Sequence, residues 1–267
     1  MSVFRVPGAE LAVEFSDEGG HPVVQLHGLT SSRARDRQLS LDLGRGLSGT
    51  RLLRYDARGH GHSTGRQVPE DYRWPALADD LLRLLDHWFP GEKVHGVGPS
   101  MGAGTLLHAA VREPGRFNGL TLLVPATAWE TRPAIAEKYR RSAELIEDEG
   151  FAAFAEADQE AHVPPATAGR PHTLPDVAEE ILPSLFRGAA LSDLPSPSDI
   201  ARLEVPTTIL AWTGDPAHPL STAERLAELM RNSTLAIART PADVELWPGV
   251  LRDDVARHGS AEASGVL

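Results

Sequence analysis

The chain has 267 residues, of which 41% are hydrophobic, a length that fits one large domain or a domain with a sizeable insertion. It contains no cysteine, which excludes disulfides, zinc–thiolate sites and thiol catalysis. The formal net charge of -11 disfavours a nucleic-acid partner, because binding a phosphate backbone requires clustered positive charge and the chain has only two lysines, Lys93 and Lys138.

Signals for export or membrane insertion are not found in the sequence. Residues 1–20 lack the basic start, apolar core and small-residue cleavage site of a signal peptide. No stretch approaches the roughly 20 apolar residues that a membrane helix needs. We therefore expect a soluble, cytoplasmic protein without a membrane partner.

Short apolar runs bounded by turn residues alternate with segments of helical period along the chain. The runs predict strands at 11–15, 22–28, 50–56, 93–98, 119–125, 206–214 and 234–238. Helices are predicted at 74–89, at 221–231, which opens with a Ser/Thr-x-x-Glu capping signature, and at 243–257. This alternation predicts an α/β fold with a mostly parallel central sheet flanked by helices.

Residues 127–199 interrupt the alternation with a mostly helical segment between two predicted strands. Its helical stretches are 131–150, 151–161 and 174–190, and prolines lie near both ends of the segment. We predict a helical lid over the strand ends, with residues 1–126 and 200–267 forming the core. A structural extension of the helical layer is the alternative, and composition favours neither.

A serine lies in the turn between a predicted strand and a predicted helix, in the sequence Gly98-Pro99-Ser100-Met101-Gly102. Glycines on both sides permit a tight turn with close backbone packing, so that the Ser100 side chain stands exposed above the sheet. The helix start also directs free N–H groups toward developing negative charge, and the Met101 N–H is the natural first donor. Taken alone, the motif is better explained by a helix-capping serine.

Three further motifs accompany this one, and together they resemble those of the alpha/beta-hydrolase family in its lidded form. The motifs are QLHGLTSS at 25–32, YDARGHGHS at 55–63, GPSMG at 98–102 and TGDPAHP at 213–219. The resemblance extends from about residue 10 to residue 256. It implies an alpha/beta-hydrolase fold with an inserted lid and a nucleophilic serine at position 100.

The resemblance also implies roles for individual residues around the serine. His27 and Gly28 would mark the oxyanion loop, and the N–H of Leu29 would be the second oxyanion donor beside that of Met101. Asp215 lies where the family places the acid that orients the catalytic histidine. A turn aspartate that caps its own loop is the alternative for this residue. In the family, the histidines of the HG and RGHG motifs usually hold loops together.

The sequence departs from the family pattern at the catalytic histidine, which normally follows the last strand. No histidine occurs between His218 and His258, and the expected position near 237–241 offers no base. His258 follows the predicted final helix, so we expect it to lie at the far end of that helix, away from Ser100. A serine without a base is a poor nucleophile, because its hydroxyl stays protonated at neutral pH.

Two explanations of this departure lead to opposite functions. In the first, the base is relocated to His218, three residues beyond Asp215, with Asp215 or Glu130 as the orienting carboxylate. In the second, hydrolysis is lost or impaired and the pocket binds a small ligand beneath the lid. The histidines of the predicted lid, His162 and His172, are a third and weaker source of a base.

The leading prediction is a serine hydrolase that cleaves a small or medium carboxylic ester, thioester or lactone by acyl transfer, without a cofactor. Trp129 is expected to form an aromatic wall of the pocket, and Arg132 either meets a substrate carboxylate or pairs with Glu130. His60 and His62 are not expected to bind a metal, because no matching carboxylate cluster follows them. The expected partner is a small-molecule substrate, and the sequence leaves a homodimer open.

Overall fold

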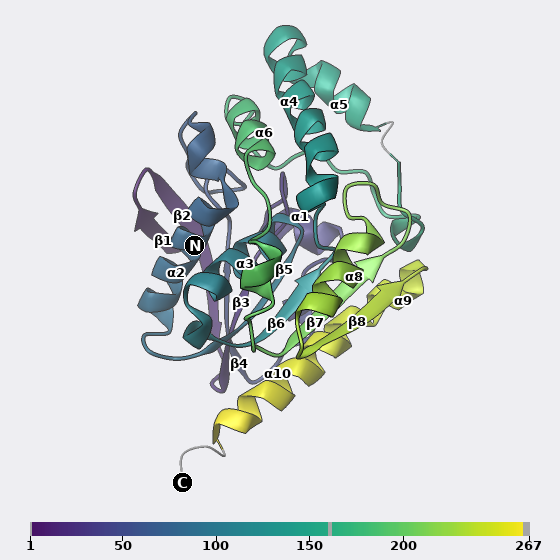
Figure 1. Cartoon of the computed structure of the whole chain (residues 1–267). Helices are drawn as coiled ribbons and strands as arrows, with labels where there is room; N and C mark the ends of the chain where they lie inside the picture. Colours follow the sequence, from purple (N-terminus) through teal and green to yellow (C-terminus); the bar gives the residue numbers. More distant parts are fainter. Residues whose placement is uncertain (1, 160–161, 264–267) are drawn as a thin grey trace.

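A mixed β-sheet of eight strands forms the centre of the molecule (Figure 1). The computed structural model describes residues 2–159 and 162–263. The strands are β1 (Ser2–Val6), β2 (Ala9–Asp17), β3 (His21–Gln25), β4 (Thr50–Tyr55), β5 (Val94–Pro99), β6 (Phe117–Leu123), β7 (Thr207–Trp212) and β8 (Ser233–Ala238). They follow the order β1-β2-β4-β3-β5-β6-β7-β8, and β3 to β8 run parallel while β1 and β2 form an antiparallel edge. The predicted α/β class is confirmed.

The inner strands are buried because helices cover the sheet on both sides. Every residue of β5 and of β7 is buried, as expected for parallel strands that lie between two helical layers. Helix α3 packs closely on β5 at Gly96, since a Cβ at this position would lie 2.5 Å from Leu106 Cδ2 and would force that side chain to move. Strand β1 lies outside the predicted strands, and its mostly exposed residues carry only a weak apolar signal.

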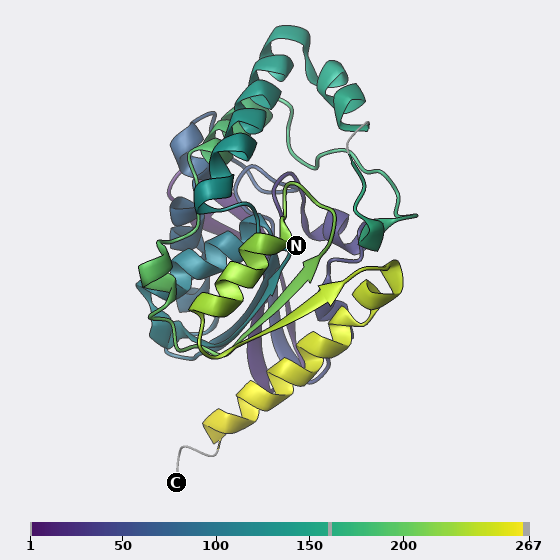
Figure 2. The same cartoon turned by 45° about the vertical axis from the view of Figure 1, so that its right-hand side comes forward.

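Two helical layers enclose this sheet (Figure 2). One contains α2 (Trp74–Trp88), α3 (Met101–Arg112) and α8 (Leu220–Leu229), and the other contains α10 (Trp247–Ala263) and the 3-10 turn η1 (Leu43–Gly46). The remaining short elements of the core are α1 (Arg33–Gln38), η2 (Pro69–Tyr72), η3 (Pro114–Arg116) and α9 (Pro241–Glu245). Ile209 and Leu210 belong to different apolar clusters, because successive side chains of a strand point to opposite faces.

Three predicted helix boundaries are wrong. Helix α8 begins directly after Pro219, which occupies the N-cap position, so the Ser/Thr-x-x-Glu motif lies inside the helix and does not cap it. The final helix is divided into α9, which begins after a capping box formed by Thr240 and Asp243, and α10, which begins at Trp247. Within residues 174–190, only α6 (Leu182–Ala190) is helical.

Residues 127–199, which we call the inserted segment, lie between β6 and β7 in the chain. They contain η4 (Trp129–Thr131), α4 (Arg132–Glu149), α5 (Phe151–Gln159), η5 (Pro165–Thr167), α6 and α7 (Pro197–Ile200). Helices α4, α5 and α6 pack together through an apolar cluster that includes Ile146, Phe154 and Phe186. Figures 1 and 2 show these helices at the top of the molecule, on the side where β5 and β7 end. Among the described residues, no helix is long and apolar enough to cross a membrane.

Candidate active site

Ser100 lies at the turn between β5 and α3, in a strained backbone conformation. Its φ is 50° and its ψ is -108°, values that residues other than glycine rarely adopt. A Cβ on Gly102 would lie 2.9 Å from the His27 carbonyl oxygen, so this position accepts only glycine without rearrangement. Ser100 occupies the N-cap position of α3, yet its side chain makes no capping hydrogen bond. The helix-capping explanation of this serine is therefore wrong, and its hydroxyl is available for another contact.

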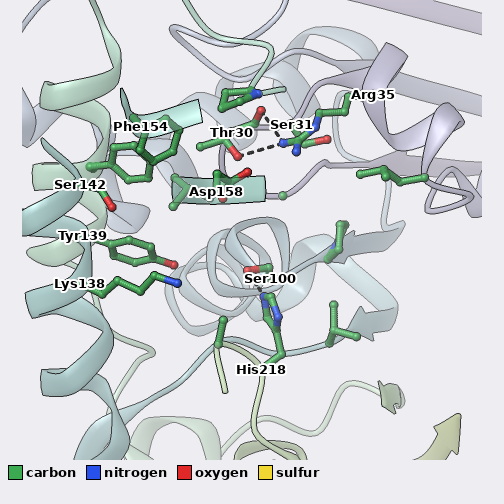
Figure 3. A pocket seen from close by; sticks show the side chains of 18 of the residues that line it. Thr30, Ser31, Arg35, Ser100, Lys138, Tyr139, Ser142, Phe154, Asp158 and His218 are labelled. Carbon is green, nitrogen blue, oxygen red and sulfur yellow. Dashed lines mark hydrogen bonds between the residues drawn. The ribbon is translucent and has the colours of Figure 1, made fainter. Parts of the chain in front are cut away.

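The hydroxyl of Ser100 is hydrogen-bonded to His218, which lies in the loop after β7 (Figure 3). The distance from His218 Nε2 to Ser100 Oγ is 2.8 Å, and that from His218 Nδ1 to Asp215 Oδ2 is also 2.8 Å. When Nδ1 donates to the carboxylate, Nε2 is left as an acceptor for the serine hydroxyl. The structure thus brings the three predicted residues into one chain of hydrogen bonds. Glu130, the alternative carboxylate, is exposed, and His218 instead pairs with Asp215.

Asp215 is held as a carboxylate by several donors at once. Burial disfavours its charge, but hydrogen bonds from His218, from the Trp212 indole at 2.8 Å and from the Ala217 N–H at 2.9 Å outweigh burial and hold its pKa below the usual range. Trp212 is buried and stacks on Trp247, with ring centroids 5.9 Å apart. The hydrogen bond from Trp212 to Asp215 was not predicted from the sequence. The signal that the sequence offers for it is a tryptophan three residues before the aspartate.

The predicted oxyanion loop lies directly against the nucleophile. A Cβ on Gly28 would lie 3.9 Å from Ser100 Cβ, and Leu29 lines the same cavity as Ser100. Met101 is the first residue of α3, and the first N–H groups of a helix have no acceptor within it. Both N–H groups therefore come from segments that adjoin Ser100. That they bind an oxyanion stays a prediction.

Arg35 ties this loop to the inserted segment. Its guanidinium donates to the carbonyl and the hydroxyl oxygen of Thr30, each at 3.0 Å, and to the hydroxyl and carbonyl oxygen of Thr173, each at 2.8 Å. Thr30 follows Leu29 directly and has a φ of 59°, which is unusual for a β-branched residue. Arg35 thus holds a strained backbone next to a predicted oxyanion donor.

The other histidines do not contact Ser100. His27 is buried, donates from Nδ1 to the Gly28 carbonyl at 2.8 Å and accepts from the Ala57 N–H at 2.9 Å. It therefore links the loop that contains Gly28 to the segment after β4. Burial lowers the pKa of His60 to about 3. The side chain of His172 lies 3.4 Å from an Asp158 oxygen. His258, as predicted, is far from the site and stacks on His95.

Two of the predicted pocket residues are placed elsewhere. The Trp129 indole donates to the Pro195 carbonyl at 3.0 Å and packs against the core, so the prediction that it walls the pocket is wrong. Arg132 is buried and lies over the Trp74 ring, with its guanidinium donating to the carbonyls of Ala189 and Ser192. It therefore joins the inserted segment to the core. Both predictions for Arg132, that it meets a substrate carboxylate or that it pairs with Glu130, are wrong.

A cavity of about 500 Å³ opens above Ser100 and His218. This volume lies within the range of pockets that hold small molecules. Its apolar walls include Leu29 from the predicted oxyanion loop, Trp212 from β7, and Tyr139, Phe154 and Phe186 from the inserted segment. The described part of the chain has no group of three or more His, Cys, Asp or Glu side chains that could hold a metal ion.

Comparisons with known proteins show the family of this chain. The chain matches the family described as alpha/beta hydrolase fold over residues 21–148. RutD of Caulobacter sp. (strain K31), which is named as a carbamate hydrolase, is 30% identical over 236 residues, covering 79% of this chain and 86% of that protein. The chain belongs to the alpha/beta-hydrolase family. The predicted family and fold are therefore confirmed.

Further relatives of this alpha/beta-hydrolase are also named for hydrolytic reactions. The 3-oxoadipate enol-lactonase 2 of Acinetobacter baylyi is 28% identical over 196 residues, covering 70% of this chain and 69% of that protein. A thermophilic esterase from Thermogutta terrifontis shares the fold, with 24% identity and a TM-score of 0.74 over 94% of each chain. The chain is accordingly an enzyme of the hydrolase class.

Proposed function

We propose that this alpha/beta-hydrolase cleaves carboxylic esters or lactones by acyl transfer through Ser100, with His218 as a relocated base. The observation that carries the proposal is the pair of 2.8 Å contacts that join Ser100 to His218 and His218 to Asp215. A serine, an imidazole and a carboxylate linked in this order are the groups that nucleophilic acyl transfer requires. The fixed backbone strain at Ser100 supports the same role, because such strain gathers at functional sites.

In the proposed reaction, Ser100 Oγ attacks the substrate carbonyl while His218 Nε2 takes the hydroxyl proton. Asp215 stabilises the resulting imidazolium through Nδ1. The N–H groups of Leu29 and Met101 bind the oxyanion, and one such donor is worth roughly 3 kcal/mol of transition-state stabilisation. His218 then gives its proton to the leaving alcohol, and a water molecule activated by the same nitrogen releases the acyl group and restores the serine.

The relocation of the base has a simple physical basis. Acid and base lie three residues apart in one loop, and the Asp215 side chain accepts hydrogen bonds from the N–H groups of Ala217, at 2.9 Å, and His218, at 3.3 Å. Pro216 and Pro219 restrict the same loop, because proline fixes φ. The loop can therefore present a histidine to Ser100 without a contribution from the chain after β8.

The substrate class is inferred from the cavity and from the relatives. Aromatic and aliphatic walls suit an acyl chain or ring of small to medium size. One relative of this chain is named as an enol-lactonase, and a protein with a similar fold is named as an esterase. We also propose that the inserted segment acts as the lid of this site, since α4, α5 and α6 supply one side of the cavity.

Hydrolysis assays test this function. The wild type should release 4-nitrophenol from esters of acetate to octanoate or open simple lactones, and Ser100→Ala should abolish turnover. Ser221→Ala, which changes an exposed serine on α8, is the matched control and should retain wild-type rates. The proposal is wrong if none of these substrates gives turnover that depends on Ser100.

A further inference from the structure

The charged side chains that line the active-site cavity differ in whether they have an ionic partner. Besides His218, these side chains are Arg35, Asp36, Lys138, Arg141 and Asp158. Arg141 pairs with Glu137 at 3.3 Å, and Asp158 faces His172 at 3.4 Å. Arg35, Asp36 and Lys138 form no ion pair within residues 2–159 and 162–263.

Arg35 and Asp36 are engaged by neutral partners. The Arg35 guanidinium donates to Thr30 and Thr173, as described above. Asp36 accepts from the Ser31 hydroxyl at 2.5 Å, and burial raises its pKa to about 7, so that it is about half-protonated at neutral pH. These two side chains hold the predicted oxyanion loop in place, and Asp36 carries only part of a negative charge.

Lys138 has no such partner. In the part of the chain that the structure describes, its three N–H donors make no hydrogen bond and its ammonium makes no ion pair. Figure 3 shows the Lys138 side chain extending from α4 beside Tyr139, with both polar tips directed toward Ser100 and His218. A positive charge with free donors therefore faces the reaction centre.

Filling the cavity changes the surroundings of this ammonium. Water solvates Lys138 while the cavity is open, and a bound substrate displaces part of that water. An ammonium that loses water without gaining an acceptor is costly, whereas a carboxylate offers it a charge-assisted hydrogen bond. The hydroxyl of Tyr139, the next residue on α4, can donate to the same carboxylate.

We propose that Lys138 binds a carboxylate carried by the substrate, so that the preferred substrates are half-esters of dicarboxylic acids, or lactones that carry a free carboxylate, and not neutral esters. This inference rests on the proposed function, because it assigns the substrate class of the same site. The contact fixes the orientation of the acyl group, since one end is held at α4 while its carbonyl meets Ser100.

Matched substrate pairs test the proposal. The mono-4-nitrophenyl esters of dicarboxylic acids with four to eight carbons are compared with the 4-nitrophenyl esters of unbranched acids of equal length, after subtraction of spontaneous hydrolysis. The wild type should give the higher kcat/KM with the half-ester in at least one pair. Lys138→Met should lower the ratio of half-ester to neutral-ester kcat/KM at least tenfold, which corresponds to about 1.4 kcal/mol.

Arg140→Met is the matched control, because Arg140 lies on the same helix outside the cavity and pairs with Glu137 at 3.1 Å. It should leave the half-ester preference within twofold of the wild type. Ser100-dependent turnover in which Lys138→Met leaves the ratio unchanged, or in which the wild type prefers the neutral esters, would overturn the inference while the proposed function stands. Absence of Ser100-dependent turnover with every ester and every lactone would overturn both.

Discussion

The hydrogen bond from Trp212 to Asp215 offers a specific test of the site, because no sequence motif required it. Trp212→Phe keeps an aromatic ring on β7 but removes the indole N–H that lies 2.8 Å from Asp215 Oδ2. His218 and the Ala217 N–H remain as donors to the carboxylate. The substitution therefore removes one donor of the network without removing a member of the proposed triad.

The size of the effect follows from the burial of Asp215, whose side chain is 12% exposed. Water replaces a lost donor poorly at such a position, and a hydrogen bond to a charged group contributes about 1.5–3 kcal/mol. We expect the free energy of unfolding to fall by about 2 kcal/mol and the pKa of Asp215 to rise. Because a less firmly held carboxylate orients His218 less well, kcat should fall about tenfold.

Trp247→Phe is the control, since it replaces the other indole of the same stacked pair with a smaller phenyl ring and leaves the hydrogen-bond donors to Asp215 in place. Urea unfolding and steady-state ester hydrolysis are measured for both variants. Loss of the stacked indole pair is common to the two, so the difference between them reports the hydrogen bond to Asp215 together with the contact of the Trp212 ring with His218. Equal unfolding free energies and equal kcat values for Trp212→Phe and Trp247→Phe would refute the reasoning.

Two further predictions concern acid stability and the oxyanion loop. Burial lowers the pKa of both His60 and His95 from 6.5 to about 3. Below pH 6.5 the unfolded chain therefore binds protons that the folded protein does not. Each of these histidines then reduces the free energy of unfolding by about 1.4 kcal/mol for every pH unit by which the pH falls. Asp36, with its pKa raised to about 7, gains stability over the same range and offsets the effect of one histidine. Urea unfolding in which the free energy of unfolding does not fall between pH 6 and pH 4 would contradict this prediction. Arg35→Met frees the strained Thr30 backbone and should lower kcat about tenfold with a smaller change in KM, whereas a rise in KM alone would show that Arg35 acts on substrate binding.

The position of the nucleophile was predictable because its determinants are local in sequence. The glycine at position 102 is required where a Cβ would meet the His27 carbonyl, and the apolar run before Ser100 forms the buried strand β5. The order of strands and helices follows equally from short apolar runs and helical periodicity. Helix starts were less predictable, because each depends on one N-cap residue. Pro219 precedes α8 and Thr240 precedes α9, and the hydrophobic pattern alone does not show either start.

The sequence named His218 as a candidate base but did not decide between a relocated base and a lost one, because the contact of His218 with the serine spans 118 positions. Strands β5 and β7 are separated in the sheet only by β6, and all three are parallel, so the loops that follow them meet at one edge. Sequence places His218 in such a loop, but hydrogen-bond distance to Ser100 depends on the packing of the whole sheet.

The cavity walls depended on non-local packing in the same way. Trp129 was the expected wall, yet its indole is bound by the Pro195 carbonyl at the other end of the inserted segment. Tyr139 and Lys138 line the cavity because α4 packs on α6 with that face turned toward Ser100. The period of α4 identifies a helix, but it does not show which part of the core that helix covers.

The rate of fluorophosphonate labelling at Ser100 tests most directly whether His218 is the base. Wild type, His218→Ala and Ser100→Ala are labelled side by side, with circular dichroism to show that each is folded. If His218 activates the serine, the wild type labels at Ser100, His218→Ala labels on the order of a thousandfold more slowly, and Ser100→Ala does not label. A wild type that stays unlabelled, or a His218→Ala variant that labels as fast as the wild type, would contradict the relocated base.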